Sequence, residues 1–400
     1  MKTTGKTGTN TRRIILIGTL MTAIAIAVLV FQTFFCAMTF EDENRIRRFH
    51  NEPANSMDMV LVGSSDAYAG FSSALAYKQY GLKSYPYTIA GQTCLLWEAM
   101  VEDVLRTQSP DVILVETYGA TYPESHFKEH NKTIEASAYK LLDTLPLTPS
   151  KLRHSVKTAK YIDDSDALSF FMPFIKYHGR YGAYYKNAKN QWNLHKTKTS
   201  PLKGNLTKTA KCRKKKLTDL SSVDEVSELS KTGEKNLREF LEYCETIENT
   251  KIVFIHFPVL AKEKGTFKYR SHTKAMMVGK IVEENGFDFI NLQGMTGELG
   301  ITQDDFSDSG HMNIYGQRKL TAAVCEILKE KYGVPVQGKH KTPDNDKEWK
   351  ESAAVYDKYY AFADKAIRAG DKVKLVDNQK TLEKVLRGYK KQGKEAEGGK

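Results

Sequence analysis

Short apolar runs alternate with amphipathic stretches in the first third of the chain. The runs at 59–62, 85–89 and 111–117 are nearly continuous, which is typical of strands buried on both faces. Amphipathic stretches at 71–80 and 93–107 lie between them and have the spacing of helices. This order of strand, helix, strand, helix and strand predicts a parallel sheet with helical crossovers.

The same alternation returns after residue 230. Strands are predicted at 251–257 and 288–292, and helices at 231–250, 271–285 and 315–332. We therefore expect an α/β domain over 57–337, in which a parallel sheet is flanked by helices in a flavodoxin-like, three-layer arrangement.

Two further parts of the chain do not follow this pattern. Residues 120–225 have an aromatic stretch (170–181) and a lysine-rich stretch, and we interpret them as an insertion that forms a lid or a polymer-facing surface. Arg180 is a candidate for gripping an acidic polymer there. After residue 338, apolar and aromatic residues recur at helical spacing, which predicts a helical extension over 338–400 whose Lys/Glu/Gly-rich end is disordered.

The longest apolar run, Ile14–Met38, contains no charged residue. As a helix it would extend roughly 37 Å at about 1.5 Å per residue, enough to cross a hydrocarbon core of about 30 Å. Because four basic residues and no acidic residue precede it, residues 1–13 are expected in the cytoplasm and the rest outside a cell membrane crossed once. The charged residues 39–56 are expected to be a juxtamembrane connector. A cleaved signal peptide is the alternative.

The composition narrows the choice of partners. The formal net charge is +12, which favours anionic neighbours such as lipid headgroups or acidic cell-surface polymers. The membrane segment argues against nucleic acid as the anionic partner. The five cysteines are widely spaced and form no CxxC pair, so we expect buried single cysteines rather than a metal knuckle or a disulfide framework.

The first candidate catalytic residues follow the first strand, which ends at Gly63. Ser64 and Ser65 come next and are expected to lie in a turn. A serine needs a histidine base, and the histidine needs a carboxylate to orient it. Asp308 and His311 are three residues apart in a glycine-containing loop, so one turn could place the carboxylate and the imidazole in the same site.

We therefore predict that one of the two serines is the nucleophile, His311 the base and Asp308 the residue that orients His311. The competing interpretations are a serine that only hydrogen-bonds within its turn and an Asp308 that caps a helix.

The remaining site residues are predicted from their positions at strand ends. Backbone N–H groups of Ser65 and Gly91 are candidate oxyanion donors, and Gly119 is a further candidate. His256 and His178 are expected to be structural. The acidic loop 304–311 has several carboxylates and one histidine, but no second ligand pair is in sight, so neither a metal nor another cofactor is expected.

These residues resemble the SGNH/GDSL hydrolase superfamily. Gly63-Ser64-Ser65 is similar to its Gly-Asp-Ser block, and Asp308-Ser309-Gly310-His311 to its Asp-x-x-His block. This alignment implies that Ser65 is the nucleophile and that Ser64 hydrogen-bonds within the turn. Together with the N-terminal anchor, they resemble the membrane-anchored branch of the teichoic-acid D-alanylation protein DltD and the alginate O-acetylation proteins. One departure is that the third block, Gly-x-Asn-Asp, is absent, and the third strand instead ends in residues 116–119. Either the oxyanion hole has two donors or another residue completes it.

The resemblance implies an extracytoplasmic serine acyltransferase or esterase that modifies a cell-surface glycopolymer through an acyl-serine intermediate. It also implies a membrane-bound O-acyltransferase as a partner. The missing third block favours the alternative, an accessory subunit of a membrane O-acyltransferase system that keeps the fold without turnover.

Overall fold

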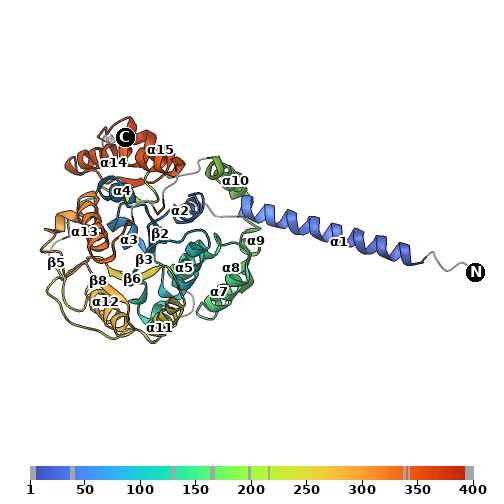
Figure 1. Ribbon diagram of the computed structural model, residues 1–400, viewed down its shortest axis with the longest axis horizontal. Helices are drawn as coiled ribbons and strands as arrows, with labels where there is room; N and C mark the ends of the chain where they lie inside the picture. Colours follow the sequence, from blue (N-terminus) through green and yellow to red (C-terminus); the bar gives the residue numbers. More distant parts are fainter. Residues whose placement is uncertain are drawn as a thin grey trace, which may run out of the picture.

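The centre of the computed structural model is a sheet of five parallel strands in the order β2-β1-β3-β6-β8 (Figure 1). The structure describes residues 6–36, 41–127, 131–162, 167–196, 200–214, 217–336, 339–340 and 343–391. The strands are β1 (Met59–Gly63), β2 (Ser84–Thr88), β3 (Val112–Glu116), β6 (Lys251–His256) and β8 (Asp288–Asn291). Each predicted apolar run therefore forms a strand, and the parallel sheet is confirmed.

Helices cover both faces of this sheet. Alternate residues of a strand point to opposite faces, so Val60 and Val62 of β1 join one core cluster, whereas Met59 and Leu61 join another. Helices α5, α11 and α12 pack on the first face, and α3, α4 and α13 on the second. Their bounds are α3 (Ser65–Gly70), α4 (Ser73–Tyr80), α5 (Trp97–Leu105), α11 (Lys231–Glu245), α12 (Phe267–Glu284) and α13 (Ile314–Tyr332). The three-layer α/β architecture is thus confirmed.

The register aligns the carboxyl ends of the central strands. Gly63 pairs with Thr88, and Glu116 pairs with Ile255. Because parallel strands end at the same edge, the turns after β1, β2 and β3 gather there. We call this edge the site edge. Three short 3₁₀ helices follow β2 and β3, and a fourth lies in the loop before α13. They are η2 (Cys94–Leu96), η3 (Thr117–Ala120), η4 (Glu124–His126) and η5 (Gln303–Asp305).

A long N-terminal helix projects from the domain (Figure 1). It consists of α1 (Lys6–Phe31) and a π-helical turn, η1 (Gln32–Cys36). The part from Thr11 to Cys36 has 26 residues and a hydropathy of 2.8 in its most apolar window, none of which is buried. By length and composition, this helix can cross a membrane.

The segment 39–56, expected to be a connector, contains a helix that belongs to the domain. In α2 (Glu41–Phe49), Ile46 and Phe49 are buried in the main core. The buried guanidinium of Arg45 donates to the backbone carbonyls of Thr88 and Gly204, at 3.0 and 2.9 Å. The charge of Arg45, which suggested a linker in the sequence, is therefore hydrogen-bonded inside the fold.

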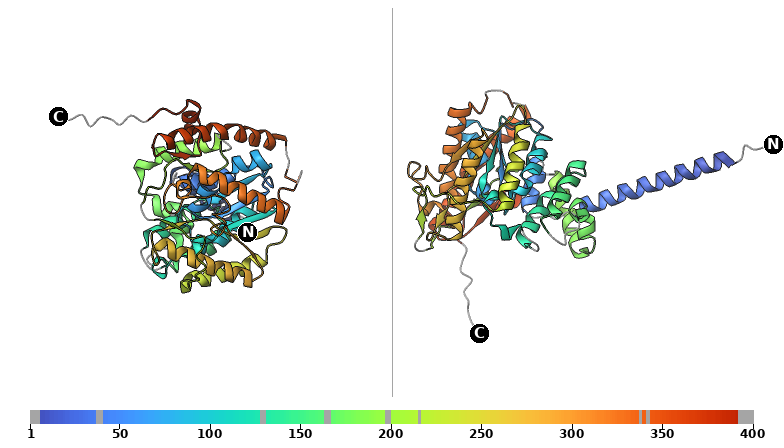
Figure 2. Two further views of the ribbon diagram at one scale, coloured as in Figure 1. Left: turned by 90° about the vertical axis from the view of Figure 1, so that its left-hand side faces the viewer. Right: turned by 90° about the horizontal axis from the view of Figure 1, so that it is seen from below.

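The region 120–225 is mainly helical. Its elements are α6 (Lys132–Leu142), α7 (Pro149–Ala159), α8 (Ala167–Phe171), α9 (Pro173–Tyr177), α10 (Tyr181–Lys196), β4 (Leu206–Lys208) and β5 (Thr218–Asp219), which pairs with β7 (Leu260–Ala261). Helices α8–α10 gather at the base of α1 in both views (Figures 1 and 2). Residues of this region reach the site edge, namely Lys208 of β4 beside Asp308, and Tyr122 and Thr133 beside Gly91. The lid or polymer-facing surface stays a prediction.

The C-terminal extension packs against the domain rather than extending from it. It consists of α14 (Pro343–Arg368), β9 (Lys374–Val376) and α15 (Gln379–Leu386). The predicted stripe on α14 is a packing face, since Tyr356 and Ala363 are buried against Leu75 of α4. Strand β9 pairs antiparallel with β4. Residues 392–400, expected to be disordered, lie outside the described residues.

Candidate active site

The turn after β1 is shaped by a glycine. Gly63 has a φ of +151°, and a Cβ built on it would lie 2.5 Å from the Cβ of Glu116. Only glycine allows this backbone angle together with such a close neighbour. Ser64 then takes the N-cap position of α3, and Ser65 is the first residue of that helix. Ser65 therefore stands at the end of a central strand, partly exposed at the site edge.

Ser64 is tied to a buried carboxylate. Its backbone N–H and its hydroxyl both donate to Glu116 Oε2, at 3.0 and 2.7 Å, and Glu116 Oε1 accepts from the N–H of Tyr118. Burial, and then the nearby Asp66 carboxylate, raise the pKa of Glu116 to about 7. The hydroxyl of Ser64 thus holds the turn, which is the role expected for it.

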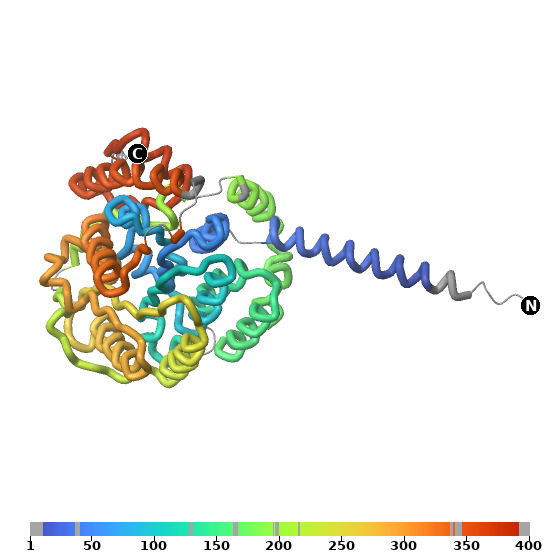
Figure 3. Tube along the Cα trace, viewed as in Figure 1, coloured from blue at the N-terminus to red at the C-terminus, as the bar shows by residue number. Residues whose placement is uncertain are grey.

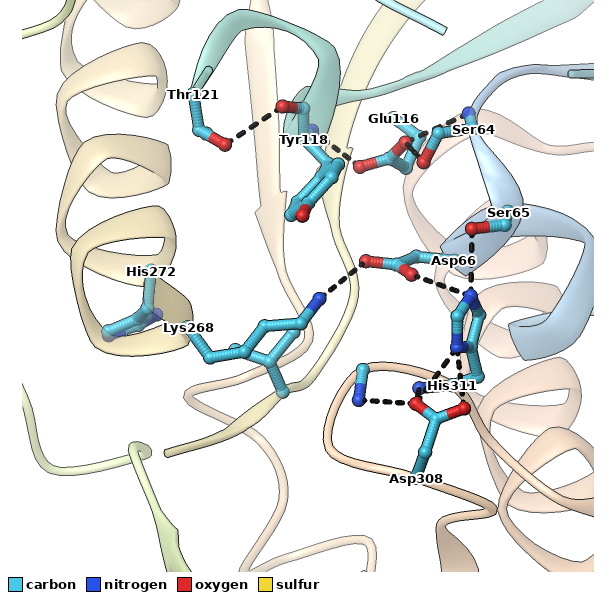
Figure 4. Close-up of polar contacts among 12 residues, drawn as sticks. Ser64, Ser65, Asp66, Glu116, Tyr118, Thr121, Lys268, His272, Asp308 and His311 are labelled. Carbon is cyan, nitrogen blue, oxygen red and sulfur yellow. Dashed lines mark hydrogen bonds and ion pairs between the residues drawn. The ribbon is translucent and has the colours of Figure 1, made fainter. Parts of the chain in front are cut away.

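The hydroxyl of Ser65 faces a histidine instead (Figure 4). Ser65 Oγ lies 2.8 Å from Nε2 of His311, and Nδ1 of His311 lies 2.9 Å from both carboxylate oxygens of Asp308. Ser65 and His311, which are 246 residues apart in the chain, therefore form one connected row with Asp308. This is the geometry that a serine nucleophile requires.

A tight loop between η5 and α13 presents Asp308 and His311. Phe306 and Met312 form a β-bridge at its base, and the N–H of Ser307 donates to the carbonyl of His311 at 2.8 Å. Inside the loop, Asp308 Oδ1 accepts from the N–H groups of Gly310 and His311. The N-cap of α13 is Asn313, so the structure does not use Asp308 as the cap of that helix.

The surroundings keep Asp308 ionised. Burial by itself would raise its pKa, but hydrogen bonds and the charge of His311, with a smaller contribution from Lys208, hold the pKa of Asp308 well below its ordinary value. Lys208 of β4 lies 3.5 Å from Asp308 Oδ2. A permanently ionised carboxylate is what a histidine needs when it takes up a proton.

Asp66 and Lys268 lie at this site and, like Lys208, were not predicted from the sequence. Asp66, next to Ser65, is 5% exposed, and its carboxylate lies 3.6 Å from His311 Nε2 and 3.7 Å from Nζ of Lys268. The Lys268 ammonium stands 4.5 Å from the ring centroid of Tyr118. Asp66 follows the predicted nucleophile directly, which could have marked it. Lys268 comes from α12, and no pattern in the sequence marks it as close to Ser65, Asp308 and His311.

The two glycines predicted as oxyanion donors have different surroundings. Gly91 follows β2 at the site edge, has a φ of +73°, and would accept a Cβ with ordinary contacts. Gly119 lies under Trp97, and a Cβ there would lie 2.9 Å from the indole ring and 3.0 Å from the carbonyl of Gln92. Close packing explains the glycine at 119. The oxyanion roles of Ser65, Gly91 and Gly119 stay predictions.

The acidic residues of the loop before α13 have separate partners. Asp304 pairs with Lys211 at 2.6 Å, and Asp305 with Lys319 at 2.9 Å. Among the described residues, two other clusters place carboxylate oxygens and a histidine nitrogen within 4.8 Å of one another. A lysine pairs with a carboxylate of one cluster, and an arginine with those of the other. The two clusters are Asp58 with Asp111 and His340, and Glu98 with Glu102 and His154.

The other histidines for which the structure describes contacts, and the cysteines, take no part in the row formed by Ser65, His311 and Asp308. His256 is buried at the end of β6, 3.2 Å from His272, and burial holds its pKa well below the ordinary value. His178 is exposed and contacts the carbonyl of Ile175, in its own turn. All five cysteines are free and buried, as expected.

No protein-family model matches the chain, and no curated protein matches it in sequence. Among solved structures, a gut microbial diltiazem-metabolizing enzyme aligns over 70% of this chain, with 11% identity and a TM-score of 0.33. The alignment spans about half of that enzyme, 48% of its length. A Parabacteroides merdae protein assigned as a GDSL-like lipase aligns over 70% of this chain and 98% of its own, with 13% identity and a TM-score of 0.32. The interpretation of the site rests on its own geometry.

Proposed function

We propose that this protein is a membrane-anchored serine esterase or acyltransferase of the SGNH type, which acts on a cell-surface glycopolymer through an acyl-Ser65 intermediate. One observation carries the proposal: Ser65 Oγ, the imidazole of His311 and the carboxylate of Asp308 are joined by contacts of 2.8 and 2.9 Å. The motif resemblance to SGNH/GDSL hydrolases supports it independently.

In the first half-reaction, His311 Nε2 takes the proton of Ser65 as Oγ attacks the carbonyl carbon of an acyl donor. The Asp308 carboxylate stabilises the imidazolium that forms. When the tetrahedral intermediate collapses, the proton passes from His311 to the leaving oxygen, and the acyl group stays on Ser65 as an ester. In the second half-reaction, a sugar hydroxyl or water loses its proton to His311 and attacks this ester. The bond between the acyl carbon and Ser65 Oγ then breaks, and His311 returns the proton to Oγ.

The oxyanion in this scheme is held by backbone N–H groups of Ser65 and Gly91. The superfamily's asparagine has no equivalent here, and Glu116 stands in that block. Because Glu116 uses both carboxylate oxygens on Ser64 and Tyr118, it offers no donor to an oxyanion. Removal of one oxyanion donor typically slows catalysis by about 10²–10³-fold. A two-donor hole therefore favours slow transfer over efficient hydrolysis.

The setting is the outer surface of a cell membrane. A helix able to cross a membrane, basic residues before it and a net charge of +12 support a cytoplasmic N-terminus and a domain beside anionic polymers. A membrane-bound O-acyltransferase is the proposed source of the acyl group, and the glycopolymer is the acceptor.

The second candidate function is an accessory subunit of such a system that does not turn over. The observation that favours it is the buried Glu116 at the place of the third block, where a donor is expected.

A fluorophosphonate probe and an activated acyl ester, each followed by mass spectrometry, distinguish the two functions. We expect a covalent adduct on Ser65 that disappears in Ser65→Ala. Ser64→Ala is the matched control. It removes the hydroxyl that donates to Glu116 but keeps the backbone N–H bond to the same carboxylate, so Ser65 should still be labelled, although more slowly than in the wild type.

Labelling that survives Ser65→Ala would exclude this residue as the nucleophile. No labelling of the wild-type protein, together with normal polymer acylation in cells that carry only Ser65→Ala, would establish the accessory subunit.

A further inference from the structure

Exposed apolar side chains gather on one part of the domain. Outside the N-terminal helix, eleven large hydrophobic side chains are exposed among the described residues, and seven of them lie between residues 147 and 192. They are Leu147, Leu152, Val156, Leu168, Tyr181, Tyr185 and Trp192. The three aromatic residues belong to α10 and are 55–79% exposed. Helices α8 and α10 carry four of the seven. Helices α9 and α10 lie beside the end of the N-terminal helix, and α8 lies next to α9 (Figures 1 and 3).

Helix α10 has two faces with different partners. With about 100° of rotation per residue, Tyr181, Tyr185, Lys189, Trp192 and Lys196 fall within an arc of about 80°, and all five are exposed. We call this side the outer face of α10.

The opposite side of α10 packs on the end of the N-terminal helix. The Tyr184 ring contacts the rings of Phe31 and Phe35, and the amide of Asn187 donates to the carbonyl of Phe35 at 2.9 Å. The outer face therefore has a defined position relative to the membrane segment.

That position corresponds to the level of the lipid headgroups. Arg13 is the last charged residue before the apolar run, and about 20 residues are needed to cross the hydrocarbon core. Counting from Arg13, the crossing ends near Thr33. Phe31 and Phe35, on which α10 packs, stand at that boundary.

The charge of this region suits an anionic surface. No aspartate or glutamate occurs between Asp166 and Asp219. In α10, Lys186, Lys189 and Lys196 are exposed, and each lysine near an anionic leaflet contributes about 1 kcal/mol. Tyrosine and tryptophan favour the membrane–water interface, where an apolar ring and a polar edge both find suitable surroundings.

We infer that the outer face of α10 lies in the headgroup layer of a bilayer that contains anionic lipid. This inference rests on the proposed membrane crossing by α1, but not on the proposed chemistry at Ser65. The face orients the domain on the bilayer, so that α1 is a fixed stem rather than a loose tether. A docking surface for a second protein is the competing explanation.

Trp192 makes the test direct, because it is 55% exposed whereas the other two tryptophans, Trp97 and Trp349, are fully buried. The full chain is reconstituted in phosphatidylcholine vesicles with or without phosphatidylglycerol, and the lipids carry bromine high on the acyl chain. We expect brominated lipid to quench the emission of the wild-type protein, more strongly with phosphatidylglycerol, and Trp192→Phe to abolish the quenching.

Replacing Lys186, Lys189 and Lys196 by glutamine should remove the extra quenching by phosphatidylglycerol. The matched control replaces Lys235, Lys262 and Lys280, which are exposed on other parts of the domain, and should leave it unchanged. Alkaline-resistant flotation of the same vesicles reports insertion of α1, and fluorophosphonate labelling reports the chemistry of Ser65. Each premise can thus fail separately.

Quenching of Trp192 by aqueous acrylamide to the same extent in vesicles and in detergent, with no effect of brominated lipid, would overturn the inference. The outer face would then be free in a bilayer and available to a protein partner.

Discussion

The site edge and α10 use polar residues in opposite ways. At the site edge, Ser64, Asp66 and Glu116 are at most 5% exposed, and each has a polar or charged partner. On α10, the side chains that distinguish the helix are exposed, and its lysines alternate with aromatic rings. In the first region the proposed function depends on bonds inside the protein, and in the second the inferred role depends on contact with a bilayer outside it.

The difference predicts how each region responds to mutation. Loss of one partner at the site edge leaves a buried group unsatisfied, which costs about 1–3 kcal/mol, and more when the group is charged. Loss of one exposed side chain on α10 costs little, and several must change together before an effect is measurable. The predictions below test this contrast, from the largest expected effect to the smallest.

The largest effect is expected for the base of the triad. His311→Gln should lower the rate of fluorophosphonate labelling by about 10³-fold or more, because Ser65 loses its proton acceptor. Thermal stability should change little, since the His311 side chain lies in a surface loop and is 24% exposed. His178→Gln is the control, because this histidine is exposed away from the triad. Labelling at the wild-type rate in His311→Gln would contradict the proposed mechanism.

The buried ion pair between Lys203 and Glu52 should give the largest loss of stability when it is broken. The ammonium of Lys203 lies 2.8 Å from Glu52, and both side chains are fully buried. Lys203→Met leaves the Glu52 carboxylate unpaired, and we expect a loss of about 3–5 kcal/mol in the free energy of unfolding.

Chemical unfolding in detergent would measure this loss. Lys235→Met, which removes an exposed lysine 3.8 Å from Glu239, should cost less than about 1 kcal/mol. Equal losses in the two variants would show that burial does not matter here. The double variant Glu52→Gln with Lys203→Met should regain part of the stability.

The turn that holds Ser65 is expected to depend on Glu116. Glu116→Ala removes the acceptor of three hydrogen bonds, from the N–H and hydroxyl of Ser64 and the N–H of Tyr118. We expect a loss of about 3 kcal/mol and slower labelling of Ser65, because the turn relaxes. Glu116→Gln keeps one acceptor oxygen and should be milder in both measurements. A Glu116→Ala variant as stable and as reactive as wild type would show that the turn is held by other contacts.

The raised pKa of Glu116 predicts a pH dependence of stability. Its pKa of about 7 in the fold lies above the 4.5 of an ordinary glutamate, so between these values the folded state binds more protons than the unfolded state. Stability from this group is therefore greatest below pH 4.5 and decreases as the pH rises to 7, by roughly 3 kcal/mol at most.

Unfolding of wild type and Glu116→Gln, measured in parallel between pH 5 and 8, would isolate this contribution. The wild-type protein should lose stability relative to the variant as the pH rises. A constant difference between the two proteins would contradict the assignment.

The smallest effect is expected at Lys208. Its ammonium is 3.5 Å from an Asp308 carboxylate that is 44% exposed, so the pair is screened by water. Lys208→Gln should change labelling by less than about fivefold, corresponding to at most about 1 kcal/mol. The effect should shrink further in high salt. A change of 10²-fold would show that Lys208 takes a direct part in the reaction.

Much of the fold could be predicted from the sequence because the sheet is central and parallel. Strands such as β1 and β3 are apolar on both faces, so their runs stand out without tertiary information. The juxtamembrane segment could not be predicted in this way. Arg45 and Arg48 resemble linker residues in the sequence, and their carbonyl partners come from Gly204 and Asp377, far along the chain.

The site was predictable to the extent that its signals are local. A glycine after a strand, two serines and the Asp-x-x-His spacing are written in short stretches, and they identify Ser65, Asp308 and His311 as candidates. Lys268 and Lys208 have no such mark, since one is a lysine of a helix and the other lies in a region without periodicity.

The sequence by itself determined the layers of the sheet, the apolar N-terminal helix and the residue types of the candidate triad, because periodicity and turn chemistry act over a few residues. Only the tertiary structure decided which serine meets a histidine. In the sequence only the alignment with the Gly-Asp-Ser block separates Ser64 from Ser65, whereas in the structure the first is held by Glu116 and the second faces His311. The same holds for α10, whose two faces acquire meaning only because one of them packs on Phe31 and Phe35. Contacts between residues this far apart depend on how whole elements pack, and local patterns do not encode that packing.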